Sequence, residues 1–318
     1  MEKFFQKISI TSASLVLVIL IGIFITLFNA SKPAIDEFGF GFITNSSWNE
    51  EITIDNPTIH VEEEIPVIDE DVIMDDDDMI IDEDSTNLNT KTIFGGFIPI
   101  IGTLLSTLIA LVFSLPIAMG IAVFLAEIAP KNISHTVSIA IELLAAIPSI
   151  IFGMWGLYYF APIVSGIVGG YQVSLLTAGL VLGVMILPFM AAVTRDSMNT
   201  TPDVLKESAY ALGATKFEVI KDIIFPYSKV GIIGSIILAL GRALGETMAV
   251  AFLIGSIFSL PSSLNSPTIS IPVAMANNFG EANGIGESAL FYLALILFVI
   301  SFAVISIAKF FFLKGHKS

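Results

Sequence analysis

The sequence ESAYALG at residues 207–213, followed after nine residues by IIFP at 223–226, is a polar stretch between two strongly apolar segments. Pro202 suits the first position of a helix, and Thr201 before it is an expected N-cap. Gly213 stands where a helix commonly ends in a residue of left-handed conformation. These signals predict a short helix that ends in a glycine turn.

A second short helix is expected directly after this turn. Thr215 and Glu218 have the T-x-x-E spacing of a capping box. The apolar residues between 217 and 224 recur with a helical period, and Pro226 is expected to stop the helix. Two short helices joined by a glycine would form a compact knob, defined here as residues 201–226.

Spacing alone leaves two interpretations of the knob open. The small side chains of Ser208 and Ala209 would let another protein surface approach closely. Alternatively, the knob would lie on lipid headgroups, where Lys206, Lys216 and Lys221 would contact phosphate groups. The first interpretation makes the knob a docking site for a protein, and the second makes it a contact with the membrane surface.

The rest of the chain has the composition of an integral membrane protein. Of its 318 residues 55% are hydrophobic, and the apolar runs are long enough for six crossings of a bilayer. The expected spans are 8–30, 98–126, 136–162, 172–194, 230–256 and 288–308. With the N-terminus in the cytoplasm, eleven basic side chains lie inside and two outside, in agreement with the positive-inside rule. The sequence therefore predicts an all-α, polytopic protein of the cytoplasmic membrane, with six transmembrane helices and both termini in the cytoplasm.

The expected organisation follows from these spans. The first span starts with basic residues, as a signal peptide does, but its apolar run exceeds a typical h-region of ~7–15 residues and is interpreted as a retained anchor. The predicted parts are residues 1–30 as the first transmembrane helix, 31–96 as an extracytoplasmic segment, 97–312 as a five-helix core with the cytoplasmic loop 195–229, and 313–318 as a cytoplasmic tail.

The extracytoplasmic segment carries the acidity of the whole chain. Residues 31–96 hold 18 acidic and 2 basic side chains, whereas the remainder holds 11 acidic and 12 basic ones. Most of these carboxylates lie in an insert at about 50–92. No glycine occurs between Gly41 and Gly95, so the insert lacks the EF-hand pattern. A solvated segment and a metal site of another kind stay open as interpretations, and no metal site is assigned.

One basic and one acidic residue interrupt the fifth expected span. Arg242 lies near its middle, where an unpaired cation is costly, and Glu246 follows four residues later on the same helix face. Gly241 and Gly245 would let a neighbouring helix come close. One interpretation is a cationic site on a translocation pathway, where the guanidinium offers two parallel N–H donors to an oxyanion. The other is an ion pair that fixes helix packing.

The knob resembles the signature E-A-A-x3-G-x9-I-x-L-P of permease subunits of ATP-binding-cassette importers, with departures at Ser208 and Phe225 that keep small and apolar character. The resemblance implies a type I importer permease core and a coupling loop that docks on an ATP-binding subunit. The docking residues that it implies are Glu207, Ser208, Ala209, Gly213, Ile223 and Pro226. No G-x-x-x-x-G-K-[ST] phosphate loop occurs in the sequence, so ATP hydrolysis is expected in a separate subunit and this chain is expected to be non-catalytic.

Four further stretches resemble the phosphate-importer permeases of the PstC type: FGFITNSSW at 40–48, IELLAAIPS at 141–149, GRALGETMAV at 241–250 and ANNFGEA at 276–282. The resemblance implies that inorganic phosphate passes Arg242 and Glu246. The implied partners are a second permease subunit, two ATP-binding subunits, an extracytoplasmic phosphate-binding protein and the lipid bilayer, with neither a cofactor nor a nucleic acid.

Three alternatives are kept. An ATP-driven importer of the same type would serve another oxyanion, sulfate or molybdate, although the sequence GRALGETMAV at 241–250 argues against it. An ion-coupled secondary transporter would show inverted repeats and gives no reason for a capped knob. A membrane-anchored signalling or adhesion protein would act through the acidic segment and leaves Arg242 and Glu246 unexplained.

Overall fold

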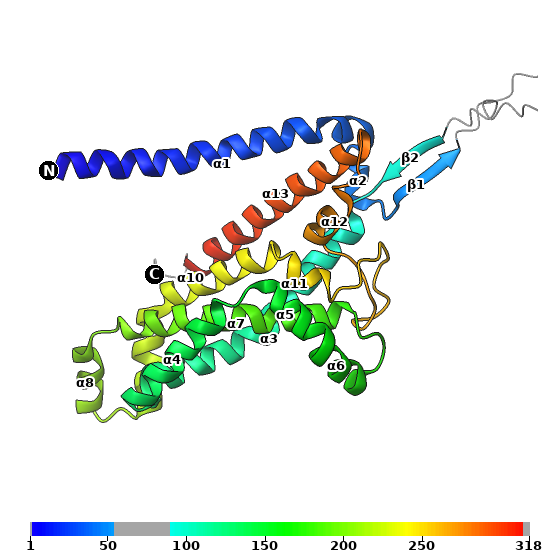
Figure 1. Cartoon of the computed structure of the whole chain (residues 1–318). Coiled ribbons are helices and arrows are strands. Elements are labelled where there is room, and N and C mark those ends of the chain that lie inside the picture. Colours follow the sequence, from blue (N-terminus) through cyan, green and yellow to red (C-terminus); the bar gives the residue numbers. More distant parts are fainter. Residues whose placement is uncertain (1, 54–89, 314–318) are drawn as a thin grey trace, which may run out of the picture.

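A computed structural model describes residues 2–53 and 90–313. The predictions for most of the acidic insert, and for the tail after residue 313, lie outside the described residues. Figure 1 shows an elongated arrangement of helices with the helix of the knob, α8, at one end and a two-stranded ribbon at the other. The knob and the attachment point of the acidic insert therefore lie at opposite ends of the molecule.

Helices make up most of the described chain. In chain order they are α1 (Glu2–Phe38), α2 (Gly41–Thr44), α3 (Phe97–Val123), η1 (Phe124–Ile128), α4 (Lys131–Ala145), α5 (Ser149–Trp155), η2 (Gly156–Phe160), α6 (Ala161–Val168), α7 (Leu175–Asn199), α8 (Asp203–Ala211), α9 (Lys216–Glu218), η3 (Val219–Ile224), α10 (Phe225–Leu244), α11 (Met248–Ala251), α12 (Ile271–Asn278) and α13 (Ile285–Leu313). The segments η1, η2 and η3 are π-helical, which means that each contains a widened turn.

Six helical stretches of the described chain are long and apolar enough to cross a membrane, which confirms the predicted number. They are Phe4–Phe38, Phe97–Ile128, Ser149–Val168, Leu175–Asn199, Lys216–Leu244 and Ile285–Phe310. The third was predicted at 136–162 and this position was wrong. Helix α4 ends at Ala145, and a new helix begins only after Pro148, because a proline disfavours helical geometry in the residue before it.

A two-stranded ribbon accompanies the helices of this all-α fold. Strand β1 (Trp48–Thr53) pairs antiparallel with β2 (Thr90–Phe94), and the register runs from Trp48 opposite Phe94 to Thr53 opposite Thr90. β-branched and aromatic residues, which favour extended chain, occupy much of both strands. In the sequence, the two strands flank most of the acidic insert.

The core is built around α7, the most deeply buried of the membrane-length helices. A Cβ atom at Gly179 would lie 2.7 Å from Cβ of Ile109, and one at Gly183 would lie 2.8 Å from a ring carbon of Phe113. These two glycines let α3 and α7 approach closely. Helix α1 packs along α13 instead and lies apart from α7 (Figure 1).

Pro226 does not stop the helix in which it lies, contrary to the prediction. The chain stays helical from Lys216 to Leu244, and Pro226 occupies the first turn of α10. The π-helical segment η3 directly precedes it. A proline removes one backbone N–H and crowds the preceding turn, and a widened turn accommodates both effects without ending the helix.

Candidate functional site

The glycine turn and the capping box of the knob form as their local sequence signals predict. Helix α8 ends before Gly213, whose φ of 89° lies in the left-handed region that glycine tolerates best. At the start of α9, the carboxylate of Glu218 accepts a hydrogen bond from the backbone N–H of Thr215 at 2.6 Å, and the Thr215 hydroxyl accepts one from the Glu218 N–H at 3.4 Å. The glycine turn and the capping box are therefore confirmed.

The predicted N-cap at Thr201 was wrong. Pro202 occupies the N-cap position of α8 without a side-chain hydrogen bond. The Thr201 hydroxyl instead lies 3.3 Å from the hydroxyl of Ser228 at the start of α10. Thr201 is buried and joins the two ends of the knob, a contact that a local capping rule cannot foresee.

The outer face of the knob presents large apolar side chains to its surroundings. Leu212 is 89% exposed, Phe217 71% and Val204 70%. A surface hollow of about 350 Å³ lies between α8 and η3, and its lining includes Gly213 and Ile223. Large exposed apolar side chains on a polar element favour a protein contact. Of the six residues that the resemblance assigns to docking, Glu207, Ser208, Gly213 and Pro226 are exposed, whereas Ala209 and Ile223 are half-buried.

Besides the Thr201–Ser228 contact, the inner face of the knob contacts the rest of the described chain through apolar side chains and an ion pair. Ala209 packs against a small core that includes Ala122, Met198 and Val219. Nζ of Lys206 lies 2.6 Å from Oε1 of Glu127 in η1, and only 15% and 10% of the two side chains are exposed. Sequence reasoning missed this pair, although Glu127 is the residue that ends the long uncharged run of the second span.

Helices α7 and α10, which flank the knob in sequence, are joined to each other near it. The hydroxyls of Thr194 and Ser235 lie 2.8 Å apart, and the Ser197 hydroxyl donates to the carbonyl of Ser228 at 3.2 Å. A Cβ at Gly231 would collide with the Ser197 side chain, so glycine permits this close approach. The knob is therefore attached to two helices, α7 and α10, that contact each other closely.

A second charged cluster lies near the same end, between α4 and α7. The buried Arg195 donates to a carboxylate oxygen of Asp196 at 2.6 and 2.9 Å and to Glu142 at 3.4 Å. Two carboxylates therefore neutralise this arginine, and the cluster links α4 to α7. Within residues 2–53 and 90–313, no group of three or more metal-binding side chains gathers in a way that could hold a metal ion.

The structure separates Arg242 from Glu246. Helix α10 ends at Leu244, so Arg242 lies in its last turn with an exposed side chain, and Glu246 lies beyond the helix. A carboxylate oxygen of Glu246 accepts a hydrogen bond from the backbone N–H of Ala249 at 3.2 Å, at the start of α11. No ion pair joins Arg242 to any described residue. The expected position in the middle of one continuous helix, with both side chains on one face, was wrong because the helix breaks at Gly245.

The chain after α11 folds back onto the start of α3. The backbone N–H of Thr268 donates to the carbonyl of Ile254 at 2.9 Å, and Gly255 has a φ of 101°. The N–H of Ile271 then donates to the hydroxyl of Thr103 at 2.8 Å. Thr103 thus has a structural role, and it ties the segment that follows Arg242 to α3.

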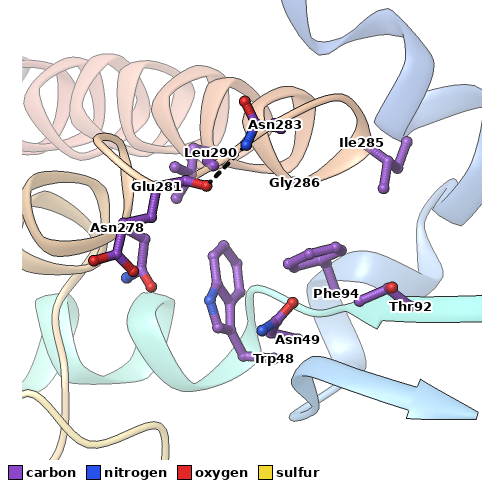
Figure 2. A pocket seen from close by; sticks show the side chains of 11 residues that line it. Trp48, Asn49, Thr92, Phe94, Asn278, Glu281, Asn283, Ile285, Gly286 and Leu290 are labelled. Carbon is purple, nitrogen blue, oxygen red and sulfur yellow. Dashed lines mark hydrogen bonds between the residues drawn. The ribbon is translucent and has the colours of Figure 1, made fainter.

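The ribbon end of the molecule contains a hollow of about 280 Å³ (Figure 2). Trp48 and Phe94 line it from the ribbon side, and Asn278 and Glu281 line it from the side of α12 and the turn after it. The Trp48 ring also stacks on Phe258 with centroids 4.7 Å apart. Two of the stretches that carry the family resemblance, 40–48 and 276–282, therefore meet at one place.

Comparison with known proteins identifies a family of membrane transport components and several relatives. The family described as binding-protein-dependent transport system inner membrane component matches residues 118–313. The phosphate transport system permease protein PstC of Pasteurella multocida is 40% identical over 99% of this chain and 93% of its own length, and that of Haemophilus influenzae is 40% identical over 97% and 92%. A probable PstC of Methanocaldococcus jannaschii is 34% identical over 70% and 76%.

Solved structures of an inward-facing MetNI methionine ABC transporter also resemble the chain. They have TM-scores of 0.48 and 0.49, with 22% and 20% identity, over 66% of this chain and 90% of theirs. The assignment rests on the sequence matches, which cover nearly the whole chain. This chain therefore belongs to the family of inner membrane components of binding-protein-dependent transport systems, among the PstC-type permeases.

Proposed function

We propose that this chain is the membrane-spanning permease subunit of an ATP-driven importer of inorganic phosphate. The observation that carries the proposal is the exposed guanidinium of Arg242, which has no carboxylate partner in the described chain and lies at the broken end of an otherwise apolar helix. Intramembrane cations without a protein partner are costly and are kept for ligands or pathways. The relatives that match almost the whole chain are named as phosphate transport permeases.

The chemistry of Arg242 suits an oxyanion. A guanidinium offers two parallel N–H donors that match two oxygens of a phosphate, and it stays charged at every physiological pH. Glu246 lies a few residues away and places a negative charge near the same passage. This charge weakens the hold on a bound anion, so that phosphate is released instead of being trapped.

The knob provides the link to ATP. The exposed side chains Val204, Leu212 and Phe217 offer an apolar contact surface to an ATP-binding subunit, and Glu207 stands on the same helix. Gly213 forms the turn that sets the angle between the two short helices. ATP hydrolysis takes place in that separate subunit. This chain contributes the translocation pathway and the knob, which receives the movement of the ATP-binding subunit.

The assembly proposed around this chain contains a second permease, two ATP-binding subunits and an extracytoplasmic phosphate-binding protein. The second permease would close the passage on the exposed side of Arg242. The chain crosses the cytoplasmic membrane several times, with the knob and both termini in the cytoplasm. Two facts support this orientation: basic residues concentrate on that side, and the start of α1 and the end of α13 lie toward the end of the molecule that carries α8 (Figure 1).

The test is uptake of radiolabelled phosphate by right-side-out vesicles that contain the complete complex, with ATP inside and the binding protein outside. We expect uptake that requires ATP, survives ionophores that collapse ion gradients, and is not competed by sulfate or molybdate. Uptake that needs an ion gradient and no ATP would establish a secondary transporter. Competition by sulfate or molybdate at equal concentration would reassign the cargo.

A further inference from the structure

We infer that the Lys206–Glu127 ion pair is a coupling element that carries the movement of the knob into α3. This inference rests on the proposed function, because it concerns how displacement of the knob by an ATP-binding subunit reaches the membrane. Lys206 and Glu127 touch neither phosphate nor ATP in this account. They are positioning residues.

The geometry of the pair suits a mechanical link. The two charged atoms lie 2.6 Å apart, and both side chains are almost fully enclosed. Water screens such a contact weakly, so it is stronger and more directional than an exposed ion pair. Glu127 lies in the π-helical turn η1 at the end of α3, and a π-helical turn changes the direction in which the following side chains point. Asp203 is 88% exposed and 4.0 Å from Lys206, so it competes little with Glu127.

In the described part of the chain, the Lys206–Glu127 pair is the polar side-chain contact that joins α8 to the end of α3. Apart from the Thr201–Ser228 contact at the base of the knob, the other side-chain contacts of its inner face in the described chain are apolar, through Ala209 and its neighbours. Apolar surfaces can slide over one another at small cost. An enclosed ion pair cannot slide, because separating the charges leaves both of them without a partner in a poorly hydrated place. A shift of α8 therefore pulls η1 and α3 with it.

The opposite end of α3 also has close contacts with another part of the chain. A Cβ at Gly102 would collide with the carbonyl oxygen of Ile269, and the Thr103 hydroxyl accepts the hydrogen bond from Ile271. The segment Ile269–Ile271 belongs to the part of the chain that folds back after Arg242 and Glu246. Helix α3 with η1 spans 32 residues, which at 1.5 Å per residue is a rod of about 48 Å.

One continuous helix thus joins the knob to the region of the phosphate passage. Its cytoplasmic end is held by Lys206 and Glu127, and its far end is held by the contacts of Gly102 and Thr103. The Lys206–Glu127 attachment transmits force from the knob to α3, in addition to stabilising the fold. This distinction can be measured, because stability and coupling respond differently to removing both charges.

The experiment uses the assembled complex in vesicles and measures phosphate ions moved per ATP hydrolysed. The main variant carries Lys206→Met together with Glu127→Gln, which removes both charges and leaves none buried alone. A second variant carries Lys206→Glu together with Glu127→Lys and restores attraction with reversed polarity. The matched control is Lys91→Met, which breaks an exposed ion pair with Glu37 at the other end of the molecule.

We expect the neutral double variant to assemble and hydrolyse ATP while its ratio of phosphate to ATP falls roughly threefold to tenfold. The reversed pair is expected to restore the ratio to within about twofold of wild type, and Lys91→Met to leave it unchanged. An unchanged ratio in the neutral double variant would overturn the inference. If that variant fails to assemble, the reversed pair decides: a ratio near wild type supports the link, and a low ratio overturns it.

The outcome also separates the inference from the proposed function. A wild-type complex that imports phosphate with ATP, combined with an unchanged ratio in the neutral double variant, refutes the coupling link alone. A wild-type complex that imports no phosphate refutes both, since the inference depends on the transport activity.

Discussion

The charged residues Lys206 and Glu127 differ from Arg242 and Glu246 in what they contact. Lys206 and Glu127 are in contact and enclosed, and they join the knob to α3. Arg242 and Glu246 lie four residues apart in sequence and form no ion pair, because α10 ends between them and Glu246 caps the next short helix. A satisfied pair holds structural elements together, whereas an unsatisfied cation is free to bind a ligand.

Breaking the satisfied pair should cost the most stability. In Glu127→Gln, the ammonium of Lys206 would stay 85% enclosed without its partner. We expect the free energy of unfolding to fall by about 3 kcal/mol, toward the lower end of the range for buried pairs because both groups keep slight exposure. The measurement is the thermal midpoint of the complex in detergent. The neutral double variant should recover much of the loss, and an unaltered midpoint in the single variant would show that the pair does not form.

Changing the unsatisfied cation should affect transport without affecting stability. Arg242→Lys keeps the charge but loses the two parallel N–H donors. We expect ATP-dependent phosphate uptake to fall about tenfold, equivalent to about 1.4 kcal/mol, while the thermal midpoint stays that of wild type. A lowered midpoint would reveal a protein partner for Arg242. Full uptake would show that a point charge is sufficient.

The glycine turn of the knob should matter to a smaller degree. A Cβ at Gly213 meets no atom within 4 Å, so Gly213→Ala is opposed only by the φ of 89°. Strain of about 1–2 kcal/mol is expected, and it should loosen the docking of the ATP-binding subunit, measured as a several-fold weaker association with the detergent-solubilised permease pair. The control is Gly234→Ala in α10, where a Cβ also meets nothing and φ is not left-handed. Equal association of the two variants would show that the turn geometry is dispensable.

The exposed ion pair between Lys91 and Glu37 should contribute least. Its charged atoms lie 3.2 Å apart, but the side chains are 46% and 31% exposed. Lys91→Met should change the free energy of unfolding by less than about 0.5 kcal/mol, since water and salt screen the attraction. A loss as large as that of Glu127→Gln would mean that enclosure is not what distinguishes the pairs.

Local signals in the sequence explain which predictions were confirmed. The Gly213 turn and the Thr215–Glu218 capping box depend on neighbours within four residues, and the structure contains both. The six membrane-length helices follow from runs of apolar residues, and their number is also confirmed. These features are local, so no knowledge of tertiary contacts is needed to predict them.

The errors arose where neighbours in space decide the outcome. Pro226 was predicted to stop a helix, but the π-helical turn before it keeps the helix continuous. Glu246 was expected to pair with Arg242, yet it caps α11 instead. Lys206 and Glu127 are 79 positions apart, so no spacing rule would pair them. The ribbon was missed because its two strands are separated by the acidic insert.

We propose that Arg242 forms no ion pair within residues 2–53 and 90–313 because its guanidinium serves phosphate. The most direct measurement compares wild type with Arg242→Gln in vesicles that contain equal amounts of assembled complex and ATP inside, following labelled phosphate and ATP hydrolysis together. We expect normal assembly, and uptake reduced to about a tenth or less because the charge-assisted hydrogen bonds to phosphate are lost. Uptake by Arg242→Gln equal to that of wild type would contradict this proposal.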